Sequence, residues 1–271
     1  MVDLSTGAQF YDFQRMTEVE LIIERHTRAL VLIPAFNEAS KIVEVIERVR
    51  GAAPEADILV VNDGSRDRTA VLATQAGALV VSHPYNMGYG VTIQTGYKYA
   101  WRHGYDFVVQ IDGDGQHDPA FIPALLAPVL AGDTDLALGS RFLSVESYRP
   151  SFFRRLGILF FRKLISVLIG REITDPTSGY QAFNRRVIGF FTTEVFPCDY
   201  PDADVLLTLN LAGFRLRELP VRMVANAEGK SMHSGLKPLY YVFKMLLSLL
   251  VTLLRSRALY AMAVRGDDHA R

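Results

Sequence analysis

Two aspartates, Asp112 and Asp114, stand one residue apart in the run Asp-Gly-Asp-Gly-Gln-His at positions 112–117. Carboxylates this close repel each other, and no lysine or arginine stands near them in the sequence. A divalent cation removes that repulsion, because Mg²⁺ and Mn²⁺ favour carboxylate oxygens and bridge them to phosphates. Gln116 offers a further neutral oxygen. The run therefore predicts a metal site, although an acidic glycine turn that simply ends a strand has the same pattern.

Three other polar clusters follow apolar runs earlier in the chain. Asp63, in the run Asn-Asp-Gly-Ser at 62–65, offers a carboxylate that can accept from an N–H group on the edge of a nucleobase. Residues 34–38 include Pro34 and Glu38 and are suited to line the same base and ribose pocket. Asn86 and Gly88 open a glycine-rich helix start, which allows the backbone to approach a ligand closely. Each cluster is also compatible with a capped turn that binds nothing.

The segments that carry these clusters alternate between strand-like and helix-like patterns. We expect strands at 29–34, 58–61, 78–82, 105–111 and 135–138, and helices at 65–76, 88–103 and 119–131. A further helix carries apolar residues at 42, 45, 46 and 49, with Asn37 as its expected cap and Gly51 and Pro54 at its end. This alternation predicts an α/β fold with a mostly parallel sheet, in which ligands bind at the carboxyl ends of strands.

Two apolar segments in the second half of the chain also carry basic residues. Residues 151–169 place Arg154, Arg155, Arg162 and Lys163 on about half of a helical wheel and Phe and Leu on the other half. Residues 236–258 form a second such segment, interrupted by Lys244. We expect both to lie in a membrane interface, with core or oligomer-interface helices as the alternative. A spanning helix would need ~20 apolar residues and is the least favoured reading.

The net charge of zero conceals a division of charge between the two halves. Residues 1–135 hold 10 Lys and Arg against 18 Asp and Glu, a net of −8, whereas residues 136–271 hold 19 against 11, a net of +8. The acidic half is suited to a cation and the basic half to phosphate or a membrane surface. The apolar fraction of 49% excludes a disordered chain, and the single cysteine, Cys198, excludes an internal disulfide and favours a reducing compartment.

The ordered set of motifs resembles the inverting family 2 glycosyltransferases with the GT-A nucleotide-binding fold. It is most similar to the branch that includes the dolichol- and polyprenyl-phosphate sugar transferases. The resemblance covers residues 29–231 and runs through positions 34–38, 62–65, 86–90, 112–117, 139–141, 175–185 and 229–231. Two positions depart from the family pattern, since Tyr89 and Asn226 stand where the family often has basic residues.

The resemblance implies a role for each matching residue. Nucleoside contacts fall to Pro34, Glu38 and Asp63, with Asn86 and Gly88 beside them, and the metal and donor diphosphate to Asp112, Asp114 and Gln116. The acceptor phosphate would meet Ser140, Arg141 and either Arg154 or Arg155. The floor between donor and acceptor would be the segment 175–180, which includes Asp175 and Ser178. The acidic pair Asp202 and Asp204 follows it, and a loop with Arg222, Lys230 and Ser231 would close over the diphosphate.

The expected reaction moves a sugar from a UDP-, GDP- or dTDP-sugar to a polyprenyl-phosphate lipid, with inversion and with Mg²⁺ or Mn²⁺. Asp112 and Arg141 would take part directly, and Asp202 would act as general base if the acceptor were instead a hydroxyl of a glycan or lipid. A non-catalytic nucleotide-sugar-binding protein is a third alternative.

The expected organisation is an arm over 1–28 without a signal peptide, a GT-A domain over 29–231 that includes the basic segment 151–170, and an amphipathic helix and tail over 232–271. We expect a cytoplasmic protein held peripherally at the inner face of the membrane and no nucleic-acid partner, and the sequence leaves a homo-oligomer open.

Overall fold

The structure is a computed structural model that describes residues 27–143, 152–197, 201, 203–223 and 237–255. Within the helices, the side chains of 152–156 and 237–242 are not described. Residues 1–26 of the expected N-terminal arm, the residues near position 230 and residues 256–271 of the C-terminal tail lie outside the described residues.

A seven-stranded mixed sheet forms the centre of the molecule, in the order β3-β2-β1-β4-β6-β5-β7. Only β6 runs against the other strands, because it pairs antiparallel with both β4 and β5 while the remaining pairs are parallel. The mostly parallel sheet expected from the sequence is confirmed. The strands are β1 (Ala29–Ala35), β2 (Asp57–Asn62), β3 (Leu79–Ser82), β4 (Phe107–Gln110), β5 (Leu136–Ser140), β6 (Gln181–Asn184) and β7 (Leu216–Pro220).

Helices cover both faces of this sheet and create two apolar cores. Strand β1 shows why, since Leu30 and Leu32 point into one core while Val31 and Ile33 point into the other, and all four are fully buried. The helices are α2 (Ile42–Ala52), α3 (Thr69–Gln75), α4 (Tyr89–Arg102), α5 (Ile122–Leu130) after the 3₁₀ turn η1 (Pro119–Phe121), α6 (Phe152–Ile169), α7 (Arg185–Phe191), α8 (Ala203–Leu211) and α9 (Lys237–Leu254).

Two local predictions are wrong, one for the helix after β1 and one for the helix after β2. Helix α2 begins at Ile42 without a side-chain cap, and Asn37 is used elsewhere. Asn37 has a left-handed backbone (φ 58°), and its Oδ1 accepts from the backbone N–H of Arg66 at 2.9 Å. That contact ties residues 37 and 66 together, and α3 begins at Thr69 rather than at Ser65.

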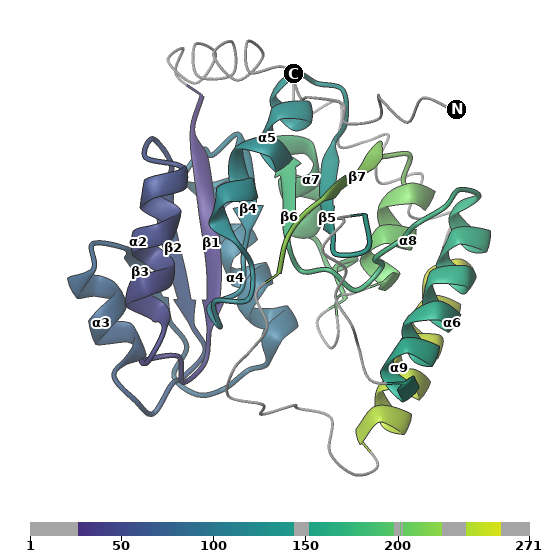
Figure 1. Ribbon diagram of the computed structural model, residues 1–271, viewed down its shortest axis with the longest axis horizontal. Helices are drawn as coiled ribbons and strands as arrows, with labels where there is room; N and C mark the ends of the chain where they lie inside the picture. Colours follow the sequence, from purple (N-terminus) through teal and green to yellow (C-terminus); the bar gives the residue numbers. More distant parts are fainter. Residues whose placement is uncertain (1–26, 144–151, 198–200, 202, 224–236, 256–271) are drawn as a thin grey trace, which may run out of the picture.

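The two apolar-basic segments form α6 and α9, which lie together at the end of the sheet remote from α3 (Figure 1). Each helix packs against α8 and buries one face, with Phe161 and Ile165 of α6 and Met245 and Leu249 of α9 in the core. The opposite faces carry exposed apolar residues, as at Val167 (71%) and Leu254 (78%), and α6 also exposes Lys163. Among the described residues, no helix combines the length and apolar content needed to cross a membrane.

Candidate active site

Asp112 lies directly beyond β4, with its side chain about one-third exposed. The hydroxyl of Tyr89 donates to Oδ1 of Asp112 at 3.1 Å and accepts from Nε2 of Gln110 at 2.9 Å. Desolvation raises the pKa of Asp112, while the Tyr89 hydrogen bond and the positive charge of Arg141 oppose that rise. The site therefore gains from any cation that neutralises this carboxylate.

Asp114 and Gln116 contact each other at the turn after Asp112. Oδ1 of Asp114 accepts from the backbone N–H of Gln116 at 2.9 Å, and the Gln116 side-chain amide donates to Oδ2. Gly115 has a φ of +76° at the centre of this turn, a conformation that other residues rarely adopt. The turn thus brings the second predicted carboxylate and the predicted amide ligand together.

His117 closes the same loop from the inside. The backbone N–H of Asp112 donates to Nδ1 of His117 at 3.1 Å, and the imidazole stacks on Tyr180 with ring centroids 4.9 Å apart. Burial lowers the pKa of His117 to about 4, so the ring is neutral at pH 7. His117 therefore holds the backbone of Asp112 in place without adding charge.

The predicted ligand set fits Mg²⁺ or Mn²⁺. Asp112, Asp114 and Gln116 offer only hard oxygen atoms, apart from the amide nitrogen of Gln116. In the part of the chain that the structure describes, no group of three or more His, Cys, Asp or Glu side chains gathers around a metal-sized space. A cation here would take its remaining ligands from phosphate oxygens and water, as Mg²⁺ usually does.

Three glycines show how closely the surrounding loops meet. A Cβ atom on Gly113 would lie 3.0 Å from the carbonyl oxygen of Pro34, and one on Gly64 would lie 2.7 Å from the backbone nitrogen of Asn86. A Cβ on Gly179 would lie 2.9 Å from the Tyr89 hydroxyl and 3.5 Å from both carboxylate oxygens of Asp112. The ends of β1, β2 and β4, the segment before α4 and the segment before β6 therefore share one site.

Asp63 is buried and holds the segment before α4. Its Oδ1 accepts from the backbone N–H of Met87 at 2.8 Å and contacts Nδ1 of His83 at 2.8 Å, and its Oδ2 accepts from the N–H of Gly88 at 2.9 Å. Gly88 itself has a φ of +95°. The structure thus gives Asp63 a loop-holding role that the sequence did not predict, beside the nucleoside contact that remains a prediction.

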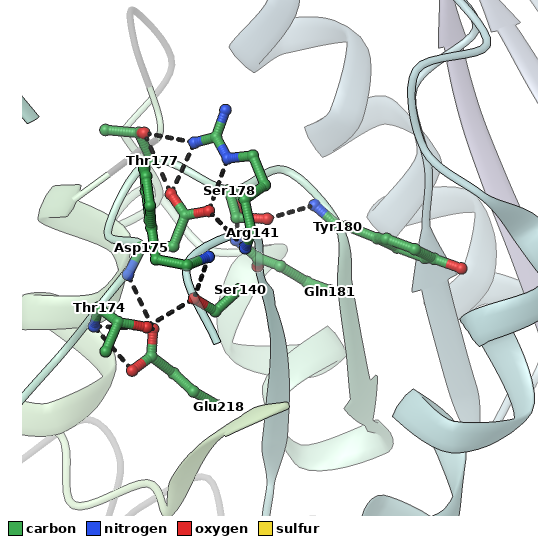
Figure 2. Close-up of polar contacts among 10 residues, drawn as sticks. Ser140, Arg141, Thr174, Asp175, Thr177, Ser178, Tyr180, Gln181 and Glu218 are labelled. Carbon is green, nitrogen blue, oxygen red and sulfur yellow. Dashed lines mark hydrogen bonds and ion pairs between the residues drawn. The ribbon is translucent and has the colours of Figure 1, made fainter. Parts of the chain in front are cut away.

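Arg141 forms a buried ion pair with Asp175 (Figure 2). Nε and Nη2 of Arg141 donate to the two carboxylate oxygens of Asp175 at 2.6 Å each, and Nη2 also donates to Oγ1 of Thr177 at 3.0 Å. Asp175 has no exposed surface and Arg141 only 8%. The Nε–Nη2 fork of Arg141 therefore binds Asp175, and the second hydrogen of Nη2 is directed at Thr177. A bidentate contact with phosphate through the Nη1–Nη2 edge would have to displace the Thr177 contact.

The two predicted serines are also largely internal. Ser140 is fully buried, and its hydroxyl lies 2.5 Å from that of Thr174. Oγ of Ser178 accepts from the backbone N–H of Tyr180 at 3.3 Å, and its carbonyl oxygen accepts from the side chain of Gln181 at 2.9 Å. Both serines shape the backbone around Arg141 and Asp175.

Three other predicted residues have partners of their own. Asp204 is buried at the start of α8 and accepts from the Ser248 hydroxyl of α9. Arg222, just after β7, donates to Oδ2 of Asp118 at 2.7 Å, which attaches it to the loop after Asp114. The backbone N–H of Glu38 donates to Oγ1 of Thr69 at 2.8 Å, which links the end of β1 to α3.

Five predicted residues lie wholly or partly outside the described part of the chain. Asp202, Lys230 and Ser231 lie outside the described residues. The backbone of Arg154 and Arg155 belongs to the first turn of α6, but their side chains are not described.

Sequence reasoning missed the residues that connect the predicted ones. The expected departure at Tyr89 was a missing positive charge, yet its hydroxyl bonds to Asp112. Gln110, buried at the end of β4, joins Tyr89 to the carbonyl oxygen of Gly179. A polar residue inside an apolar strand was a usable signal for Gln110. Glu218, which accepts from the backbone N–H groups of Thr174 and Asp175, stands in an edge strand between Arg and Leu and has no distinguishing pattern.

A comparison with protein families matches residues 30–190 to glycosyl transferase family 2. The chain belongs to glycosyl transferase family 2. The match spans more than half of the chain and contains the Asp63, Asp112 and Arg141 loops, so the protein is a glycosyltransferase as expected.

Two relatives in this family extend the likeness beyond that region. The chain is 33% identical over 217 residues to the polyprenol monophosphomannose synthase of Mycolicibacterium smegmatis, which covers 77% of this chain and 82% of the relative. It is 30% identical over 223 residues to the undecaprenyl-phosphate mannosyltransferase of Micrococcus luteus, covering 77% of this chain and 88% of the relative.

A solved structure confirms the GT-A-like fold. Glucosyl-3-phosphoglycerate synthase of Mycobacterium tuberculosis, crystallised with Mn²⁺, uridine diphosphate and glucosyl-3-phosphoglycerate, superposes with a TM-score of 0.63. The superposition covers 93% of this chain and 86% of that protein at 22% sequence identity.

Proposed function

We propose that this glycosyltransferase moves a sugar from a nucleotide-sugar to a polyprenyl phosphate at a membrane surface, with inversion at the anomeric carbon. The observation that carries the proposal is the guanidinium of Arg141, which Asp175 holds in a bidentate pair at the start of the segment that reaches Asp112 at Gly179. A cation-binding pair and a fixed positive group beside it suit two anionic substrates, a diphosphate leaving group and a phosphate acceptor. The two relatives named above, which are polyprenyl-phosphate mannosyltransferases by name, support this acceptor class.

The donor would bind at the ends of β1, β2 and β4. Pro34, Glu38 and Asp63 would contact the nucleoside, while Asn86 and Gly88 would let the backbone approach it. Asp112, Asp114 and Gln116 would hold Mg²⁺ or Mn²⁺, which when bound supplies Lewis-acid stabilisation to the departing nucleoside diphosphate.

The acceptor would bind on the β5 side of the site. A phosphate is already anionic near neutral pH, so the protein must orient it rather than deprotonate it. Arg141 would do so through a guanidinium that Asp175 prevents from rotating, with Arg154 or Arg155 adding positive charge. The loop of Arg222, Lys230 and Ser231 would instead close over the donor diphosphate. Asp202 and Asp204 would border this side, Asp202 as a general base only for a hydroxyl acceptor.

The exposed faces of α6 and α9 support a peripheral position at the inner face of the membrane. Four apolar side chains on these helices are each at least 47% exposed: Leu159 and Phe160 on α6, and Leu250 and Leu254 on α9. The other face of each helix is buried in the core. Apolar side chains on otherwise well-packed helices are suited to insertion among lipid headgroups. A polyprenyl chain could then remain in the bilayer while its phosphate reaches Arg141.

A donor and acceptor screen tests the proposed function. The purified protein would be incubated with UDP-, GDP- and dTDP-sugars and Mn²⁺, with and without a polyprenyl phosphate in detergent, while release of nucleoside diphosphate is measured. We expect release from one donor class that requires both the metal and the lipid phosphate. Release that needs only a hydroxyl acceptor would contradict the proposal and favour transfer to a glycan or lipid hydroxyl.

A further inference from the structure

Glu218 lies in β7, opposite Leu138 of β5 in the parallel register, and its carboxylate faces the segment that leads into β6 (Figure 2). Oε1 of Glu218 accepts from the backbone N–H of Asp175 at 2.9 Å and from the hydroxyl of Thr174 at 3.0 Å. The backbone N–H of Thr174 donates to both oxygens, at 2.8 Å to Oε2 and at 3.0 Å to Oε1. Three donors from two consecutive residues thus converge on one side chain that the proposed reaction does not use.

The first consequence concerns the direction of Asp175. Its backbone nitrogen is fixed by Glu218, and its carboxylate then accepts from Nε, Nη2 and the backbone N–H of Arg141 at 2.6, 2.6 and 3.1 Å. Because Asp175 has no exposed surface, water cannot replace these contacts. The position of the Arg141 guanidinium therefore depends on Glu218 of the neighbouring strand β7, which acts through Asp175.

A second connection reaches the backbone beside Arg141. The Thr174 hydroxyl donates to Glu218, so the Ser140 hydroxyl, 2.5 Å away, donates to Thr174. The Ser140 oxygen in turn accepts from the backbone N–H of Phe142 at 3.3 Å. The residues before and after Arg141 are thus joined to the same carboxylate, independently of the Asp175 side chain.

We propose that Glu218 is a positioning residue that fixes the guanidinium of Arg141 for the acceptor phosphate. The inference rests on the proposed function, because that function gives Arg141 its acceptor. A carboxylate accepts hydrogen bonds at both of its oxygens. A glutamine has an N–H₂ group in place of one oxygen and would turn it toward one of the three donors. Losing this arrangement should release Arg141 from one geometry without affecting the nucleotide side of the site.

The principal test is Glu218→Gln, assayed with a nucleotide-sugar, Mn²⁺ and polyprenyl phosphate. We expect kcat/KM for the acceptor to fall about ten- to a hundredfold, the range for disrupting charge-assisted hydrogen bonds, while KM for the donor changes less than about twofold. The matched control is Glu172→Gln, since Glu172 is largely exposed and pairs with Arg162 at the surface. The control should leave both parameters unchanged.

A double-mutant cycle separates positioning from general bracing of the fold. If Glu218 acts through Arg141, Glu218→Gln should change acceptor kcat/KM by less than about twofold in an Arg141→Ala background. An equal loss in both backgrounds, an unchanged acceptor kcat/KM, or a parallel loss of donor affinity would overturn the inference. Failure of Arg141→Ala itself to weaken the acceptor would instead overturn the proposed function.

Thr174→Val provides a second variant in case Glu218→Gln does not fold. It keeps the side-chain volume and removes only the hydroxyl between Ser140 and Glu218. A selective loss of acceptor kcat/KM, smaller than that of Glu218→Gln, would support the inference. No loss in a variant with the thermal stability of the parent protein would count against it.

Discussion

Several side chains of the candidate site are held in place by other side chains. Asp112 and Asp114 were visible in the sequence as a pair. The contacts by which His117 and Tyr89 fix the backbone and side chain of Asp112 were not. Arg141 was visible as a basic residue after a strand, whereas its bond to Asp175 joins positions 34 residues apart. Spacing along a chain predicts local ligand sets and carries no information on such long-range contacts.

The metal-binding pair gives the first prediction. Asp114→Ala should lower metal-dependent transfer at least about a hundredfold, because a direct ligand should matter no less than the outer contacts that cost ~10–100-fold. Nucleoside diphosphate release would be measured across a Mn²⁺ titration. Asp133→Ala is the matched control at an exposed turn, and full activity of Asp114→Ala at equal metal concentration would refute the assignment.

At the scale of elements, the first half of the fold was more predictable than the second. Strands β1 and β2 are continuous apolar runs, and the helix around Ile42 and Val49 has a clear period, so periodicity alone indicated them. Strand β6 has only four residues, Gln181–Asn184, and its polar ends give no strand signal. Its antiparallel pairing with β4 and β5 is a tertiary contact that no local pattern encodes.

The connection between β5, β6 and β7 gives a stability prediction. Asp135 is buried, and its carboxylate accepts from Arg215 at 3.2 Å and from Asn184 at 2.9 Å. Hydrogen bonds from Arg215 and Asn184, opposed by desolvation, hold the pKa of Asp135 below its usual value. The stabilisation is therefore present above the unfolded-state pKa of about 3.9 and is lost as pH falls through the lower native pKa.

Asp135→Asn should consequently lower the free energy of unfolding by about 1.5–3 kcal/mol at pH 7, with a smaller difference from the parent as the pH falls below about 4. Urea unfolding between pH 7 and pH 3 measures this. Asp133→Asn, two residues away and exposed, controls for the change of charge. A difference that stays constant over this range would show that the carboxylate charge is not the cause.

Helices α6 and α9 combine two features that the sequence presented as alternatives. The sequence left open whether they belong to the core or to a membrane interface, and the structure places one face of each in the core while the other carries exposed apolar residues. Helical period predicted an amphipathic segment, but α6 has basic residues on its outward side that made the buried face hard to identify from sequence alone.

Leu250→Asp tests the exposed face of α9. Leu250 is 53% exposed, so the substitution should leave the melting temperature nearly unchanged while weakening binding to anionic lipid vesicles about tenfold or more. Vesicle co-sedimentation measures the binding. Val71→Asp introduces the same charge at a similarly exposed position on α3, and an equal effect from both variants would mean that α9 has no special role.

At the scale of the whole molecule, the division of charge gains a structural meaning. The −8 half supplies β1 to β4 with the predicted metal ligands, and the +8 half supplies Arg141, α6 and α9. The two halves meet where Gly179 approaches Tyr89 and Asp112. A neutral protein can therefore present separate sites to two anionic substrates, one through a cation and one through arginine.

The central claim is that the acceptor is a phosphate. The most direct measurement compares transfer from the active nucleotide-sugar to a polyprenyl phosphate and to the polyprenol of the same chain length, under the same Mn²⁺ concentration. We predict sugar transfer to the phosphate and none to the alcohol, because Arg141 recognises the anionic group. Equal transfer to the alcohol would contradict this account.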